Sequence, residues 1–212
     1  MAGIYVHIPF CSQACYYCDF HFSTSLKIQD RMLLCIKREI ELKKHYLNNP
    51  LIQTIYFGGG TPSLIPTHSI KAIIDKISAN FKLSQHVEIT IESNPEDITE
   101  TKIKNWENIG VNRISLGIQS FRNKDLIYMN RSHNKDHSFI ALDLLQRSRI
   151  NNISIDLIYG FPLLSDVDWI DNLKKALKYS INHISCYCLT VEKKTALYQF
   201  IKKGQQKPLD PK

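Results

Sequence analysis

The chain has 212 residues and a formal net charge of +7, with 43% hydrophobic and 22% charged residues. These values favour one soluble globular domain with a sizeable core, and they argue against a disordered or fibrous protein. No apolar run approaches the roughly eighteen residues of a membrane-spanning helix, and the first residues lack the layout of a signal peptide. We therefore expect a cytoplasmic protein without stable membrane insertion. The basic residues form no arginine-rich stripe with interleaved aromatics, so we expect no nucleic-acid partner.

Short apolar runs alternate with longer helical patterns along the chain. Strands are expected at residues 4–8, 52–57, 87–92, 113–117, 154–158 and 184–189. Helices are expected at about 26–47, around 70–81, from 99, at 124–129 and 136–146, from 165, and from about 194. The isoleucines between Ile70 and Ile77 are β-branched, but their spacing of three and four residues favours a helix.

Two helix ends carry specific signals. Ser165 and Asp168 have the spacing of an N-terminal capping box, and Gly110 stands where a glycine ends a helix. The whole pattern amounts to six βα units at roughly thirty-residue spacing, which indicates a parallel sheet. Six units are too few for a closed eight-stranded barrel. We therefore predict an α/β protein with a partial (β/α)6 barrel.

Three cysteines lie within eight residues, at Cys11, Cys15 and Cys18. This C-x3-C-x2-C spacing lets three thiolates approach one metal centre, and a [4Fe–4S] cluster with three thiolate ligands keeps one iron open. Zinc is the alternative, since His7 or His21 would complete a Cys3His set, although no second C-x-x-C follows. A disulfide framework is the weakest alternative, because the cysteines are clumped and no secretory segment is evident.

Polar residues stand at or near the carboxyl ends of the expected strands. They are Gly58–Thr61, Glu92, Gln119, Asp156 and Thr190. In parallel α/β barrels this end carries the active site, so these residues predict a polar ligand across the barrel mouth. Three glycines in a row let a ligand approach bare backbone N–H groups, although glycines after a strand also serve as turns.

Several residues also have a purely structural interpretation. Glu92 lies in an alternating strand, where a carboxylate can face solvent, and Arg131 can be a solvated helix-end charge. Asp156, by contrast, is embedded among apolar residues. Because a buried carboxylate needs a partner, a ligand hydroxyl or ammonium is the better explanation there. Cysteines outside the cluster of three are interpreted as small buried residues rather than ligands: Cys35, Cys186 and Cys188.

The segment from Tyr5 to Cys11, the cysteine spacing, and the run Gly58-Gly59-Gly60-Thr61-Pro62 together resemble the radical S-adenosylmethionine (SAM) superfamily. Within this superfamily, the sequence around these motifs is similar to the anaerobic coproporphyrinogen III oxidase family, which includes the HemW-type heme chaperones. The resemblance extends from Tyr5 to about Glu192.

The resemblance implies a [4Fe–4S] cluster, SAM, and heme as cargo for an unknown acceptor protein. It makes Cys11, Cys15 and Cys18 the cluster ligands. The positions that match SAM contacts are Tyr5, Tyr17, Gly59, Gly60, Thr61, Glu92, Gln119, Arg131, Asp156 and Thr190. For this cofactor class it also implies reductive cleavage of SAM to a 5′-deoxyadenosyl radical.

One departure favours the chaperones over the oxidases. The oxidases carry a further cysteine two residues after the third, where this chain has Phe20, and they carry a longer segment before the first cysteine. We expect a heme chaperone that does not decarboxylate coproporphyrinogen III. We also expect a radical-SAM core at residues 1–192, followed at 193–212 by the start of a linker to a C-terminal region.

Overall fold

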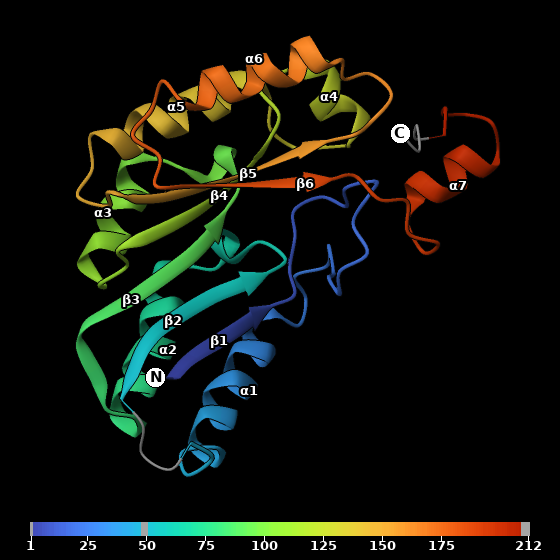
Figure 1. Ribbon diagram of the computed structural model, residues 1–212. Coiled ribbons are helices and arrows are strands. Elements are labelled where there is room, and N and C mark those ends of the chain that lie inside the picture. The colour runs from blue at the N-terminus through green and yellow to red at the C-terminus, as the bar shows by residue number, and fades with distance from the viewer. Residues whose placement is uncertain (1, 48–50, 209–212) are drawn as a thin grey trace.

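A computed structural model describes residues 2–47 and 51–208. One sheet of six parallel strands, in sequence order, forms its centre. The strands are β1 (Ala2–Ile8), β2 (Ile52–Gly59), β3 (Leu83–Ser93), β4 (Arg113–Gln119), β5 (Asn152–Tyr159) and β6 (His183–Cys188). The sheet twists and, within the described residues, β1 and β6 remain its two open edges (Figure 1). The predicted partial barrel of six parallel units is confirmed.

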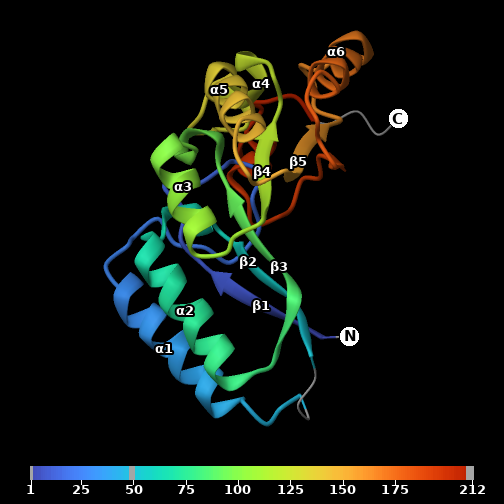
Figure 2. The same ribbon diagram turned by 90° about the vertical axis from the view of Figure 1, so that its left-hand side faces the viewer.

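Helices follow the strands and cover one face of the sheet (Figure 2). They are α1 (Gln29–Leu42), α2 (Thr67–Asn80), α3 (Glu100–Asn108), α4 (Asn123–Tyr128), α5 (Lys135–Gln146) and α6 (Asp166–Ala176). A further helix, α7 (Ala196–Lys202), lies beyond the carboxyl end of β6 (Figure 1). Short 3-10 turns occur at Pro62–Leu64 and Pro95–Asp97. No helix among residues 2–47 and 51–208 has the length and hydropathy to span a bilayer.

The core lies between the sheet and this helical layer. Ile55 and Phe57 of β2 are fully buried, as are Ile73 and Ile77 of α2. Burying one such side chain contributes roughly 1.5–3 kcal/mol. Because side chains alternate along a strand, the opposite face of the sheet carries the intervening residues, and several are polar. These are Tyr56, Thr90, Glu92, Ser115, Ser154 and Asp156. The barrel interior is therefore polar, and the apolar core surrounds it.

Helix ends agree with the predicted signals except at α1. Ser165 and Asp168 form the capping box of α6, and Gly110 has a φ of 91° just after α3. The predicted helix at 26–47 is shorter in the structure and ends at Leu42. Ile40 is the last buried side chain of this helix, so packing stabilises no further turn.

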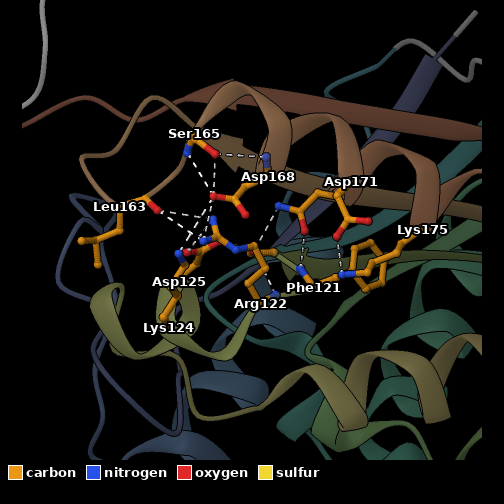
Figure 3. A network of polar contacts seen from close by, with 11 residues as sticks. Phe121, Arg122, Lys124, Asp125, Leu163, Ser165, Asp168, Asp171 and Lys175 are labelled. Atoms are coloured by element: carbon orange, nitrogen blue, oxygen red, sulfur yellow. Dashed lines mark hydrogen bonds and ion pairs between the residues drawn. The ribbon is translucent and has the colours of Figure 1, made fainter.

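A polar network ties the loop after β4 to α6 (Figure 3). The carboxylate of Asp125 is completely buried and accepts a hydrogen bond of 2.7 Å from Ser120. The guanidinium of Arg122 lies 3.3 Å from Asp125 and 3.0 Å from Asp168 of α6. Asn172 of α6 donates to Ser120 at 3.1 Å. These contacts hold α4, and therefore the segment that follows it, in place beside the barrel mouth.

Candidate functional site

A cavity of about 610 Å³ opens at the carboxyl ends of the strands. It brings together twelve of the thirteen residues that the sequence analysis proposed for the site. They are Cys11, Cys15, Tyr17, Cys18, Gly59, Gly60, Thr61, Glu92, Gln119, Arg131, Asp156 and Thr190. Its volume lies within the range of small-molecule sites. The convergence expected from parallel strands is therefore present in the fold.

Tyr5 is the one proposed residue that does not line the cavity. Its ring stacks on Tyr56 with centroids 5.8 Å apart, and its hydroxyl lies 3.3 Å from Nδ1 of His7. The side chain is 56% exposed. Tyr5 therefore supports a neighbour of the cavity wall and contributes no part of the wall itself.

The cysteine loop, residues 11–18, leaves the end of β1 and crosses the cavity. Cys11 is anchored by its backbone N–H, which donates to the carbonyl of Ser23 at 3.1 Å. All three cysteines of the loop are free thiols and partly buried. Burial raises the pKa of Cys11, while a hydrogen bond with Thr61 opposes the shift. Burial also raises the pKa of Cys18.

The described residues contain no group of three His, Cys, Asp or Glu side chains that converges on a single metal ion. The proposed zinc set with His7 or His21 is accordingly not formed in this structure. An iron–sulfur cubane has a different requirement, because each of its cysteine ligands binds a different iron. All three cysteines line the same cavity, which is compatible with that arrangement.

The glycine run brings β2 against the start of the cysteine loop. Gly59 has a φ of 115°, and a Cβ atom there would lie 2.6 Å from the ring of His7. A Cβ atom at Gly60 would lie 2.6 Å from the backbone oxygen of Phe10. A side chain at either position would displace the loop or the strand. The next residue, Thr61, donates its backbone N–H to the carbonyl of Phe10 at 2.6 Å.

Two carboxylates line the cavity, Glu92 from β3 and Asp156 from β5, with β4 between these strands. Glu92 accepts hydrogen bonds from the hydroxyl of Tyr56 at 2.8 Å and from the N–H of Gly59 at 3.0 Å. Burial raises the pKa of Glu92, and these two bonds oppose the shift. Burial also raises the pKa of Asp156, opposed by a hydrogen bond with Ser185 of β6. Both carboxylates are thus partly desolvated and open to a ligand that carries donors.

Arg131 lines the cavity beside the cysteine loop. One guanidinium nitrogen, Nη1, donates to Sγ of Cys15 at 3.3 Å, and Nη2 donates to Oδ1 of Asn94 at 2.6 Å and to the carbonyl of Gly117 at 3.0 Å. Its Nε is buried without a hydrogen-bond partner among the described residues. The arginine therefore belongs to the site, and the interpretation as a solvated helix-end charge is wrong.

Two residues that contact the cavity side chains were not found by the sequence analysis: Asn94, which accepts from Arg131, and Tyr56, which donates to Glu92. Asn94 stands two residues after Glu92, and strand alternation would have placed it on the same side. Tyr56 stands two residues before Gly58 and is likewise on the interior face. A Cβ atom at Gly58 would lie 2.8 Å from the ring of Tyr56 and 3.0 Å from Oε1 of Glu92. Gly58 thus leaves the space in which these two side chains meet.

Three cysteines predicted to be buried are exposed: Cys35, Cys186 and Cys188. Cys35 lies on α1 away from the buried stripe that contains Ile36 and Ile40. The other two lie on β6, which is the last strand of the open sheet. Alternation predicted their shared face correctly, but not that this face of an edge strand stays accessible. Cys188 also lines the cavity.

Comparisons with known proteins agree with this arrangement. The Radical SAM superfamily matches residues 5–187 of the chain. The chain is 36% identical over 199 residues to the heme chaperone HemW of Buchnera aphidicola, across 92% of this chain and 52% of that protein. It is 33% identical over 207 residues to the heme chaperone HemW of Mycobacterium tuberculosis, across 96% of this chain and 53% of that protein. The chain therefore spans about half the length of the curated relatives it matches.

A solved structure has a similar fold. It is the coproporphyrinogen III oxidase HemN of Escherichia coli, which is described as a radical SAM enzyme. The two structures superpose with a TM-score of 0.84 at 25% sequence identity. The match covers 95% of this chain and 46% of that chain.

Proposed function

The chain belongs to the radical SAM superfamily, and on that premise we propose that it forms the cofactor-binding core of a heme chaperone. Membership of the superfamily implies a [4Fe–4S] cluster and SAM as cofactors. In this proposal the whole protein binds heme and passes it to an acceptor protein in the cytoplasm. The chaperone assignment is supported by relatives of that name at 33–36% identity over more than nine-tenths of the chain.

One observation carries the proposal. The three free thiols of the cysteine loop and the polar residues at the carboxyl ends of the other strands line the same cavity. Cys11, Cys15 and Cys18 suit a cluster with one open iron, because they supply three thiolates from one loop. The buried Nε of Arg131, which has no partner among the described residues, points to an acceptor group supplied by a ligand. The residues present therefore fit both cofactors.

We assign the remaining residues of the cavity wall to SAM binding. Glu92 is suited to accept from the ammonium group, and Asp156 to accept from ribose hydroxyls. Tyr17 provides an aromatic surface for the adenine. Gly59, Gly60 and Thr61 allow SAM to approach the backbone closely. Gln119 and Thr190 add further polar atoms to the cavity lining. When bound, the cluster and SAM together supply one-electron chemistry.

Heme requires an apolar surface for the macrocycle and an axial ligand to iron. We assign neither to a particular residue of this chain. We propose residues 1–192 as the radical-SAM core and 193–212 as the start of a linker. Within that linker, the described part contains α7, where Leu197 is buried and donates its N–H to the carbonyl of Tyr16 at 2.8 Å.

Oxygen-independent coproporphyrinogen III oxidation is the second candidate, and the fold similarity to the Escherichia coli oxidase supports it. The sequence favours the chaperone, because Phe20 stands in place of the oxidases' further cysteine. Phe20 lines the cavity and is 76% exposed. An anaerobic assay with SAM, a reductant and coproporphyrinogen III separates the two. Formation of protoporphyrinogen IX would overturn the chaperone proposal.

The cofactor assignment is tested by anaerobic reconstitution of single alanine variants at Cys11, Cys15 and Cys18. We expect each to lose the brown absorbance and most of the bound iron and sulfide. Cys35→Ala is the matched control, because that thiol is exposed on α1 and should leave iron loading unchanged. Wild-type iron content in all three variants would refute the assignment. Hemin titration of the protein, extended to the length of its relatives, tests the cargo.

A further inference from the structure

Four consecutive residues of the cysteine loop are bonded to three consecutive residues that follow α4. The contacts are Gln13 Nε2 to the carbonyl of Asn130 at 2.9 Å, Asn130 Nδ2 to the carbonyl of Ala14 at 2.7 Å, Arg131 Nη1 to Cys15 Sγ at 3.3 Å, and Tyr16 N–H to the carbonyl of Met129 at 3.1 Å. The two segments are more than a hundred residues apart in sequence. Their contacts therefore form a tertiary clamp on the loop.

Asn130 is at the centre of this clamp. It has a φ of 55°, a left-handed conformation in which asparagine, aspartate and glycine are favoured. Its N–H donates to the carbonyl of Ile127 at 3.0 Å, and the N–H of Arg131 donates to the carbonyl of Leu126 at 2.9 Å. This pattern is a Schellman ending of α4. It turns the amide of Asn130 toward Ala14 and directs Arg131 into the cavity.

Apolar packing supports the clamp from behind. Leu126 and Met129 are buried in a small cluster against which Tyr16 and Tyr17 pack. The loop is thus held on two sides by groups that contain no thiol.

We propose that Asn130 is a positioning residue, which holds the cysteine loop in its cluster-binding shape through the amide contact with Ala14. The inference rests on the proposed function, since it assigns a role toward the cluster on Cys11, Cys15 and Cys18. A loop already ordered by the protein loses less conformational entropy when it binds metal. Outer contacts that orient metal ligands commonly change metal affinity by about 10–100-fold when they are removed.

Two substitutions isolate the side-chain amide. Asn130→Asp keeps the size and tolerates the left-handed backbone, but a carboxylate cannot donate to the carbonyl of Ala14. Asn130→Gly keeps the backbone conformation and adds no charge near the thiols. Gln13→Glu removes the reciprocal donor from the other side. Ile127→Ala is the control, because that side chain lies on α4 and is exposed.

The readout is the rate at which reconstituted protein loses iron to a chelator, measured beside the melting temperature of the cluster-free protein. We expect both Asn130 variants to lose iron about tenfold faster than wild type at a similar melting temperature, with Gln13→Glu in the same direction. If both Asn130 variants lose iron at the rate of Ile127→Ala, the role of Asn130 is refuted, while the proposed cofactor stands. Wild-type protein that binds no iron would refute the proposed cofactor, and the inference with it.

Discussion

The hydroxyl of Tyr56 donates a hydrogen bond of 2.8 Å to Oε1 of Glu92, on the interior face of the barrel. Gly59 donates to the other carboxylate oxygen, so Glu92 is oriented from two sides. Tyr56 in turn stacks on Tyr5. Tyr5, the proposed residue outside the cavity, is thereby linked to the cavity wall through Tyr56.

Tyr56→Phe is expected to weaken SAM binding about tenfold at unchanged iron content. The substitution removes one donor from a charged acceptor, an interaction of roughly 1.5–3 kcal/mol. Equilibrium binding of SAM to the anaerobic protein measures the change. Tyr46→Phe is the control, because Tyr46 is exposed and distant from the cavity lining. Equal affinities in the two variants would leave Tyr56 without a role in orienting Glu92.

Glu92→Gln and Asp156→Asn are expected to reduce SAM affinity while the cluster remains loaded. Each removes a partly buried charge that faces the cavity, and loss of one partner of a buried charged contact typically costs roughly 2–5 kcal/mol. The same binding measurement applies, with iron content determined on each sample. Asp171→Asn, at an exposed carboxylate of α6, is the control. Unchanged affinity in both cavity variants would mean that these carboxylates only complete the barrel interior.

The stability of the cluster-free protein is expected to depend on pH through Asp156. Burial raises the pKa of this carboxyl in the folded state, so the folded protein holds its proton more tightly than the unfolded chain. The resulting stabilisation is fully present below the pKa of Asp156 in the unfolded chain, about 3.9. It is lost as the pH rises through the higher pKa of Asp156 in the folded protein.

Asp156→Asn removes this dependence and leaves a neutral side chain at the same place. We expect the variant to melt at a higher temperature than wild type at neutral pH, with the difference shrinking as the pH falls toward 4. Thermal unfolding between pH 4 and 8 measures it. A variant that is less stable than wild type at neutral pH would show that the Ser185 hydrogen bond outweighs the burial of the charge.

The buried carboxylate of Asp125 offers a test of the network in Figure 3. Asp125→Ala leaves the buried hydroxyl of Ser120 without its acceptor, while Arg122 keeps Asp168 as a partner. Leaving a buried donor unsatisfied costs about 1–3 kcal/mol of unfolding free energy. Asp75→Ala is a matched control, because Asp75 and Lys71 form an exposed pair on α2 at 2.6 Å, outside the network. Such surface pairs contribute roughly 0–1 kcal/mol. Urea unfolding that shows equal losses in the two variants would contradict the assigned importance of the network.

Prediction from the sequence was accurate where a local rule sufficed. The capping box at Ser165, the helix end at Gly110 and the six parallel strands of the sheet follow from turn chemistry and periodicity. It was wrong where exposure depended on neighbours. Cys186 and Cys188 were predicted to be buried, yet β6 has a neighbouring strand on one side only in the part of the chain that the structure describes. The length of α1 was likewise overestimated, because its end depends on where core contacts stop.

The cysteine spacing, the glycine run and the polar residues at strand ends are contained in short stretches of the chain, and they were enough to indicate the site and its chemistry. Their physical basis is local: alternation along a strand, bare backbone at glycine, and thiols that share one loop. The partners that hold those groups come from distant segments. Tyr56 reaches Glu92, Arg131 reaches Cys15, and Asn130 reaches Ala14 only because parallel strands end at the same edge of the sheet. A sequence pattern cannot predict such contacts, because their energy depends on the distance between atoms in the folded structure and not on separation along the chain.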